Sequence, residues 1–188
     1  ETLGGLAKPA ESKADPVDTL SFIPSKQAGK GEVYESPEQF IEKLLPVAER
    51  AAQQIGIEPK YLVAQAALET GWGKFVIQDE KGGSSFNLFG IKADQRWDGK
   101  AATTTTHEFI AGKRLTVNEP FRAYQSVEES FTDYAKFITE SPRYQQAVAS
   151  AADSASYFKN LQNAGYATDP NYAEKIMRIA DSDWFANV

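Results

Sequence analysis

Residues 64–74 read AQAALETGWGK and place a single carboxylate, Glu69, at the end of an apolar run that favours a helix. Two glycines, Gly71 and Gly73, follow closely and predict the end of that helix, because glycine releases the backbone from helical geometry. An ionised glutamate on an apolar helical face is unfavourable unless it is paired. The position therefore needs either a partner or a chemical function.

The same helix is predicted to begin near Pro59 and to turn its apolar residues, among them Leu62 and Ala66, toward the core. Glu69 follows Leu62 by seven residues and Ala66 by three, which places it on the same helical face. Two interpretations stay open: Glu69 is a catalytic acid, or it is a helix-end carboxylate in an ordinary ion pair. The second is the more common in helical proteins, and carboxylates with a perturbed pKa also occur at purely structural sites.

Length and composition predict one folded domain with an arm. The chain has 188 residues, of which 41% are hydrophobic, enough for one sizeable core. Residues 1–33 mix Gly, Pro, Ser, Lys and acidic residues without a sustained period and predict a flexible linker, whereas residues 34–188 predict the domain. Because the chain starts at Glu1 without an apolar signal segment, we expect a fragment or a processed form.

Several kinds of chemistry are disfavoured by the composition. The net charge of -6 argues against a nucleic-acid or anionic-membrane partner, and no apolar run is long enough to span a bilayer. With no cysteine and only His107, the sequence has no disulfide and no zinc-ligand spacing, and Gly82-Gly83 lacks the Lys-Ser/Thr of a phosphate-binding loop. We therefore expect no metal and no organic cofactor, which leaves carboxylates and aromatic side chains to carry any chemistry.

An N-terminal helix is predicted from Ser36, its N-cap, to a stop at Gly56, with apolar residues at helical spacing between them. Pro46 conflicts with this helix because it removes the hydrogen bond to the carbonyl of Glu42. We expect a kink at Pro46 or two short helices.

The middle of the chain predicts a packed loop and a hairpin. Residues 78–100 surround an apolar stretch at 86–91 with Gly, Asp, Lys and Asn. The β-branched run from Thr103 to Phe109 predicts a strand, and a second strand starts near Arg114. Further helix starts are predicted at Ser126, Ser141, Asp153 and Asp169. The sequence thus predicts an α+β fold, a mostly helical domain with one small β-hairpin.

Glycoside hydrolysis is a reaction that carboxylates perform without a cofactor. It needs one carboxyl that is protonated and donates to the leaving oxygen, and usually a second that is ionised and activates water or supports a cationic sugar. Glu69 suits the first role because its apolar neighbours Leu68 and Trp72 disfavour the charged form and raise the pKa. This is the effect that lysozyme illustrates.

The segments AQAALETGWGK, FNLFGIKA and QNAGYATDPNYAEKI, in this order, resemble the glucosaminidase domains of flagellar peptidoglycan hydrolases in glycoside hydrolase family 73. The resemblance covers roughly residues 36–184. It implies a lysozyme-like fold with a cleft between a helical lobe and a small β-lobe, and hydrolysis of the β-1,4 bond after N-acetylglucosamine. It also implies peptidoglycan glycan strands and flagellar rod proteins as partners, in the periplasm.

On this resemblance Glu69 is the general acid, Glu108 of TTTTHEF is the second carboxylate, and Tyr166 of GYATDP is a tyrosine of the cleft. Core packing is the alternative for Tyr166, since tyrosine is common in cores with its hydroxyl satisfied. The side chains expected to stack on sugar rings are Trp72, Phe89, Trp97 and Tyr124. Each of these aromatic residues could instead belong to the core or to the rim of the site.

Two other functions fit the same features. A lytic transglycosylase would share the fold and a lone glutamate but would leave an anhydro sugar because no water attacks, and Glu108 favours hydrolysis over this reaction. A noncatalytic wall-binding or rod-scaffold module would have a groove without a working acid, whereas the motif around Glu69 is intact. Flagellar proteins of this type also carry an N-terminal rod-scaffolding region, while only the arm at residues 1–33 precedes the domain, which leaves rod assembly open.

Overall fold

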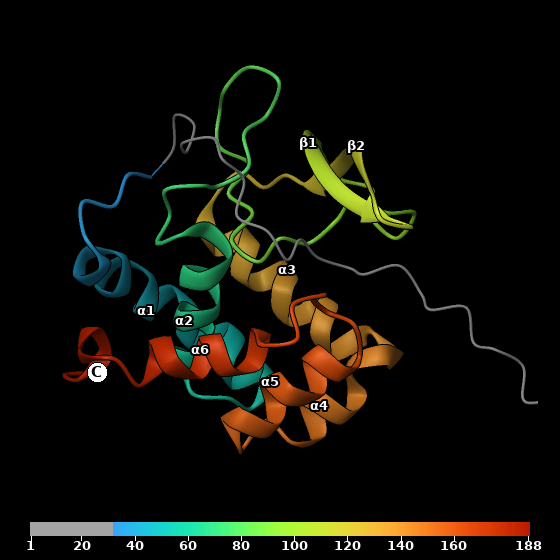
Figure 1. The fold of residues 1–188 in the computed structure, drawn as a ribbon. Helices are drawn as coiled ribbons and strands as arrows, with labels where there is room; N and C mark the ends of the chain where they lie inside the picture. Colours follow the sequence, from blue (N-terminus) through green and yellow to red (C-terminus); the bar gives the residue numbers. More distant parts are fainter. Residues whose placement is uncertain (1–31) are drawn as a thin grey trace, which may run out of the picture.

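The computed structural model describes residues 32–188, apart from the side chains of 106–110. Nearly all of the arm expected at residues 1–33 therefore lies outside the described residues. A helical body and a two-stranded hairpin that extends from it make up this part of the chain (Figure 1). The α+β class expected from the sequence is confirmed.

Helix α1 (Pro37–Ile55) begins and ends where the sequence predicts. The hydroxyl of Ser36 accepts a hydrogen bond from the backbone N–H of Gln39, and Gly56 ends the helix in the left-handed conformation at φ 95°. The helix runs without interruption through Pro46, so of the two expected outcomes the division into two short helices does not occur. A kink at Pro46 stays a prediction. Pro46 and Glu42 both lie on the exposed face, where water can solvate the carbonyl that the proline leaves unbonded.

Helix α2 (Pro59–Thr70) is the central element of the body. It is buried on almost every side and packs against both α1 and α6, while α3 (Val127–Glu140) packs against α1. The remaining helical elements are η1 (Pro142–Tyr144), α4 (Gln145–Ala149), α5 (Ser154–Asn163), α6 (Tyr172–Ala180) and η2 (Asp183–Phe185). Polar side chains on α2 are therefore at least partly enclosed by protein.

The predicted helix starts are confirmed at Ser126 and Asp153, whose side chains cap α3 and α5. The last helix begins at Tyr172, slightly later than expected from Asp169. The Asp169 carboxylate accepts a hydrogen bond from the backbone N–H of Asn171 and forms a turn there, and the helix starts only after this turn.

The hairpin pairs β1 (Ala101–Ile110) with β2 (Lys113–Arg122) in an antiparallel ladder. The predicted hairpin is confirmed, and β1 is longer than the run from Thr103 to Phe109 that indicated it. Ala111 and Gly112 form the turn with φ of 51° and 76°, as a tight hairpin requires. Near the base of the hairpin, Ala102 and Phe121 pack on Ile77 in a small apolar cluster separate from the main core.

The loop between α2 and the hairpin is packed, as predicted, around the buried amide of Asn87. Its Nδ2 donates to the carbonyls of Ile91 and Arg122, each at 2.9 Å, and its Oδ1 accepts from the Ile91 N–H at 3.2 Å. The two bonds with Ile91 hold the loop together, and the bond to Arg122 fastens it to the end of β2.

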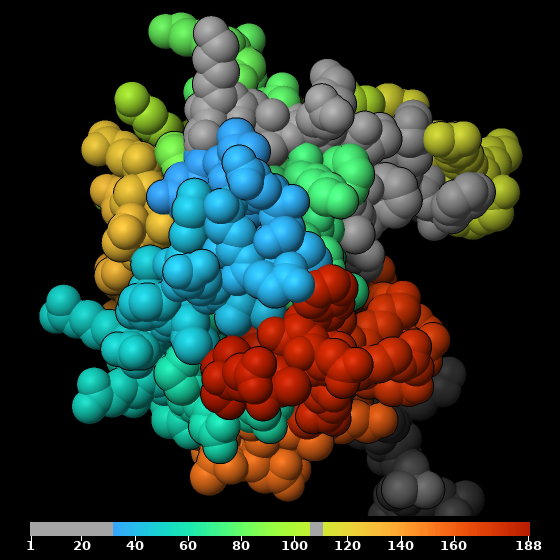
Figure 2. Space-filling view, turned by 90° about the vertical axis from the view of Figure 1, so that its left-hand side faces the viewer, coloured from blue at the N-terminus to red at the C-terminus, as the bar shows by residue number. Residues whose placement is uncertain are grey.

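The C-terminal segment closes the body beside α1. Figure 2 shows this segment, in red, lying next to the blue and cyan surface of α1. Trp184 meets the ring of Trp72 edge to face at 6.4 Å, and Phe185 lies 6.3 Å from it. The two ends of the domain therefore cover the turn that follows Glu69.

Pro46→Ala should stabilise the protein by about 2 kcal/mol. Replacing proline in a helix interior stabilises the folded state by about 3 kcal/mol, because the backbone hydrogen bond is restored. The unfolded state gains conformational entropy when proline is removed, which offsets about 1 kcal/mol of this. Urea unfolding measures the change, with Glu49→Ala, on an exposed position of the same helix, as the control. Equal or lower stability of Pro46→Ala would contradict the account of α1.

Candidate active site

Glu69 occupies the last turn of α2, and a tight turn fixes its position. The hydroxyl of Thr70 donates to the Ala66 carbonyl at 2.7 Å and accepts from the Gly73 N–H at 2.9 Å. Gly71 and Gly73 have φ of 56° and 83°, and Trp72 between them has φ of 61°, a conformation that bulky residues rarely adopt. The backbone thus reverses directly after the carboxylate.

The carboxyl group of Glu69 accepts a hydrogen bond at Oε1 from the hydroxyl of Tyr172, at 2.6 Å. Burial raises the pKa of Glu69 to about 8, although the Tyr172 hydrogen bond acts to lower it. No cation within residues 32–105 or 111–188 forms an ion pair with Glu69, so the ion-pair interpretation does not hold there. The side chain as a whole is only half-buried. A protonated carboxyl at neutral pH with some access to solvent is what a general acid requires.

Two residues that the sequence analysis did not single out support Glu69: Tyr172 bonds it directly, and Gln65 bonds Tyr172. Gln65 lies one helical turn before Glu69 on α2 and is fully buried, and its Nε2 donates to the Tyr172 hydroxyl at 3.1 Å. A glutamine within the apolar run AQAALE was a signal for such a role. QNAGYATDPNYAEKI contains two tyrosines, and spacing alone does not tell which one reaches the carboxylate.

Tyr166 lies in the core. Its ring is fully buried, 5.8 Å from the ring of Tyr172, and its hydroxyl donates to the carbonyl of Phe89 at 2.8 Å. The connector was expected to present this side chain to the cleft, but it turns the ring inward and leaves Tyr172 to contact Glu69. A hydrogen bond from Tyr166 to substrate stays a prediction, and it requires the bond to Phe89 to open.

Glu108 lies on β1 opposite Leu115, three residues before the Ala111-Gly112 turn. It therefore belongs to the half of the hairpin nearer the tip. Its side chain lies outside the described residues, and its role stays a prediction.

Two of the four aromatic residues expected to stack on sugars lie among other rings of the main core. Phe89 is fully buried, with its ring stacked on Tyr134 at 4.1 Å, which leaves no face for a sugar. Trp72 is half-buried, and Phe40 meets its ring edge to face at 5.7 Å.

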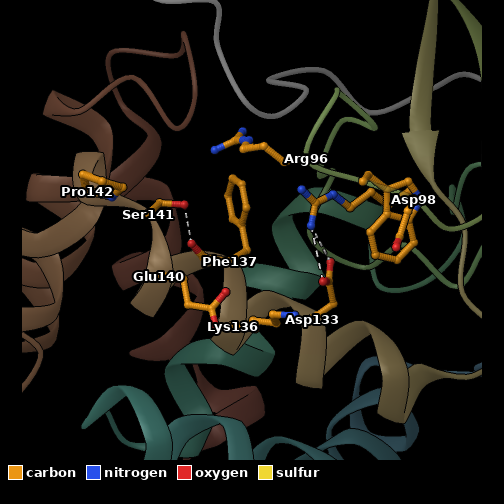
Figure 3. Close-up of a pocket in the computed structure, with 10 residues that line it drawn as sticks. Arg96, Asp98, Asp133, Lys136, Phe137, Glu140, Ser141 and Pro142 are labelled. Atoms are coloured by element: carbon orange, nitrogen blue, oxygen red, sulfur yellow. Dashed lines mark hydrogen bonds and ion pairs between the residues drawn. The ribbon is translucent and has the colours of Figure 1, made fainter.

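The other two, Trp97 and Tyr124, lie where the hairpin joins the body. The guanidinium of Arg122 sits between the rings of Trp97 and Phe137, at 4.9 Å and 5.1 Å from their centres. The Nη1 of Arg122 lies 3.0 Å from the carboxylate of Asp133 on α3, an ion pair that Figure 3 marks with dashed lines. The same carboxylate accepts a hydrogen bond from the Tyr124 hydroxyl at 2.5 Å. Tyr124 is buried and bonded at this junction.

Trp97 keeps part of its ring accessible. It lines a hollow of about 370 Å³ beside the Arg122–Asp133 pair and a second one of about 410 Å³ that reaches Asp79 and Glu129. Among the four aromatic residues, Trp97 is therefore the one that borders open space in both hollows.

The part of the chain that the structure describes has no group of three or more His, Cys, Asp or Glu side chains that could hold a metal ion. In the same part, no helix has the length and apolar character needed to cross a membrane.

The profile of the glucosaminidase family, described as mannosyl-glycoprotein endo-β-N-acetylglucosaminidase, matches residues 45–183. The chain belongs to this family. Peptidoglycan hydrolase FlgJ of Pseudomonas aeruginosa is 51% identical over 148 residues, which cover 79% of this chain and 37% of that protein. The chain thus spans little more than a third of the length of this curated relative.

Two solved structures are similar in fold. A peptidoglycan hydrolase mutant from Sphingomonas sp. A1 has a TM-score of 0.70 and 44% identity, with 78% of this chain and 94% of that chain covered. A C-terminally truncated glycoside hydrolase domain of Salmonella typhimurium FlgJ has a TM-score of 0.63 and 41% identity, with 77% and 95% covered.

The raised pKa of Glu69 predicts a pH-dependent stability. The folded protein keeps the proton up to a pH of about 8, whereas the unfolded chain releases it near 4.5, so the contribution of Glu69 is fully present below 4.5 and is lost as the pH rises between these values. Glu69→Gln does not titrate. In thermal unfolding, the melting temperature of Glu69→Gln should therefore rise relative to that of the wild type as the pH increases from 4 to 8. A constant difference in melting temperature across this range would contradict the assigned pKa.

Proposed function

We propose that this domain hydrolyses the β-1,4 bond between N-acetylglucosamine and N-acetylmuramic acid in peptidoglycan, with Glu69 as the general acid. The observation that carries the proposal is the carboxyl of Glu69, raised in pKa by burial and bonded at Oε1 by Tyr172. Membership in the glucosaminidase family and the names of the similar hydrolases support the choice of bond and substrate.

The proton is delivered from the carboxyl oxygen that Tyr172 leaves free. Because Oε1 accepts the hydroxyl hydrogen of Tyr172, the acidic proton resides on Oε2 and passes from there to the leaving glycosidic oxygen. Glu108, on the hairpin, acts as the base that activates water or as the carboxylate that supports the cationic sugar. Trp97 supplies an aromatic face for a more distant sugar ring.

The biological setting is the bacterial cell wall. The relative from Pseudomonas aeruginosa is named FlgJ, and this similarity supports opening of the wall for the flagellar rod, in the periplasm and with rod proteins as partners. Peptidoglycan is the proposed substrate in this setting.

Glu69→Gln should keep the fold and lower the rate by about 100-fold or more, because it removes the proton that a general acid transfers. The test is clearing of a cell-wall gel, together with release of reducing ends in solution. Glu174→Gln, at an exposed position of α6, is the matched control and should be as active as the wild type. Clearing by folded Glu69→Gln at the wild-type rate would end the assignment.

Glu108→Gln should reduce hydrolysis by about 100-fold, since the second carboxylate then no longer activates water or supports the sugar cation. Glu119→Gln, on the other strand near the hairpin base, provides the control. Mass spectrometry of the wild-type products separates hydrolysis, which adds water, from the transglycosylase alternative, which leaves anhydro sugars. Full activity of Glu108→Gln would remove this residue from the mechanism.

A further inference from the structure

A line of buried polar groups runs from Glu69 into the core. The hydroxyl of Tyr172 bonds Glu69 at 2.6 Å, and Gln65 Nε2 bonds Tyr172 at 3.1 Å. On the other side of the amide, Gln65 Oε1 accepts the hydroxyl of Tyr134 at 2.7 Å, and the hydroxyls of Tyr134 and Tyr157 lie 2.6 Å apart. Groups from α2, α3, α5 and α6 thus meet in one hydrogen-bonded line.

The amide of Gln65 gives this line a direction, because one of its ends only donates and the other only accepts. Its Nε2 faces Tyr172, so the single hydrogen of the Tyr172 hydroxyl is left for Glu69. With the amide reversed, Tyr172 would donate to Gln65 instead. A protonated Glu69 would then have to donate its own proton to Tyr172.

Building on the proposed role of Glu69 as general acid, we propose that Gln65 is a positioning residue that directs the Tyr172 hydroxyl onto Glu69 Oε1 and so keeps the transferable proton on Oε2. Gln65 does not touch the sugar in this proposal. It acts through Tyr172 and decides which oxygen of the acid carries the proton.

Burial makes this arrangement specific. Gln65 is fully buried, and no buried side-chain polar atom in the described part of the chain lacks a hydrogen-bond partner. The titratable groups that face Glu69 there are phenols, Tyr172 from α6 and Tyr166 from the preceding connector. Burial raises the pKa of both, and the charge of Glu69 adds to this effect. Among the described residues only Tyr172 bonds the carboxyl, so none of them supplies a substitute donor when the Tyr172 hydroxyl is misdirected.

Three variants test the role of Gln65. Gln65→Leu removes both ends of the amide, and Tyr157→Phe removes a buried hydroxyl of the same line that lies beyond Tyr134. Gln65→Glu keeps the shape, and as long as it is protonated it has one donating and one accepting oxygen like the amide. Circular dichroism and thermal unfolding identify the variants that fold.

The first readout is the pKa of Glu69, from the carbon-13 shift of its carboxyl during a pH titration. Because the Tyr172 bond lowers this pKa, Gln65→Leu should raise it by about 0.5, the size expected when a hydrogen bond to a carboxylate is weakened. Tyr157→Phe should leave it unchanged. An unmoved pKa in Gln65→Leu, or an equal rise in Tyr157→Phe, would overturn the proposal.

The second readout is hydrolysis of peptidoglycan fragments. Gln65→Leu should lower kcat about tenfold with KM unchanged, since a misdirected proton affects the chemical step and not sugar binding. Gln65→Glu should recover kcat to within about threefold of wild type at pH 5 and lose it again as the introduced carboxyl ionises. Wild-type kcat in Gln65→Leu, or a Gln65→Glu activity that follows the wild-type pH profile throughout, would contradict the role.

The two proposals fail separately. If the wild-type protein releases no products from peptidoglycan, the proposed function is wrong, while the carbon-13 titration still decides whether Gln65 directs the Tyr172 bond. Should Gln65→Leu not fold, the pH dependence of the Glu69 titration in Gln65→Glu decides in its place: a curve identical to that of the wild type at every pH would overturn the inference.

Discussion

The burial of α2 is the constraint on which the candidate site depends. This helix has protein on almost every side, so a carboxylate in its last turn is held away from bulk water and has no cation beside it in the described residues. Its ionised form is therefore disfavoured, and a hydroxyl from α6 satisfies Oε1. The reactive state of Glu69 thus follows from the packing of the body, not from a charged neighbour.

A buried charge pair at the base of the hairpin helps to hold it on this body. Arg122 at the end of β2 forms an ion pair with Asp133 on α3. In addition, the Asn87 amide donates hydrogen bonds to the carbonyls of Ile91 and Arg122. Removal of either charged partner would leave the other buried and unpaired, which is strongly destabilising. The base of the hairpin is therefore fixed, and any approach of Glu108 to a bound sugar must come from the strands beyond this junction.

The elements and their order were predictable because local signals agree with the packing. Ser36, Ser126 and Asp153 cap helices where expected, and the position of Glu69 on an apolar face correctly indicated a raised pKa. The sequence left open whether Pro46 divides its helix, because the answer depends on whether the unbonded carbonyl is exposed to water, which local spacing does not settle.

The partners of Glu69 were not predictable in the same way. Whether Tyr166 or Tyr172 reaches the carboxylate depends on how the connector before α6 turns, and that turn includes the Asp169–Asn171 hydrogen bond, which local spacing did not predict. For Phe89 the sequence left open whether the ring stacks on a sugar or belongs to the core, and Tyr134 and Phe131, distant in sequence, enclose it in the core. Contacts of this kind are set by tertiary packing, which local spacing does not encode.

The central claim is that Glu69 holds a proton at neutral pH because it is buried against Tyr172. Its most direct test is the titration of the Glu69 carboxyl in the wild-type protein, followed by carbon-13 NMR and assigned by comparison with Glu69→Gln. The account predicts a pKa of about 8. A value near 4.5, the ordinary value for a glutamate, would contradict it.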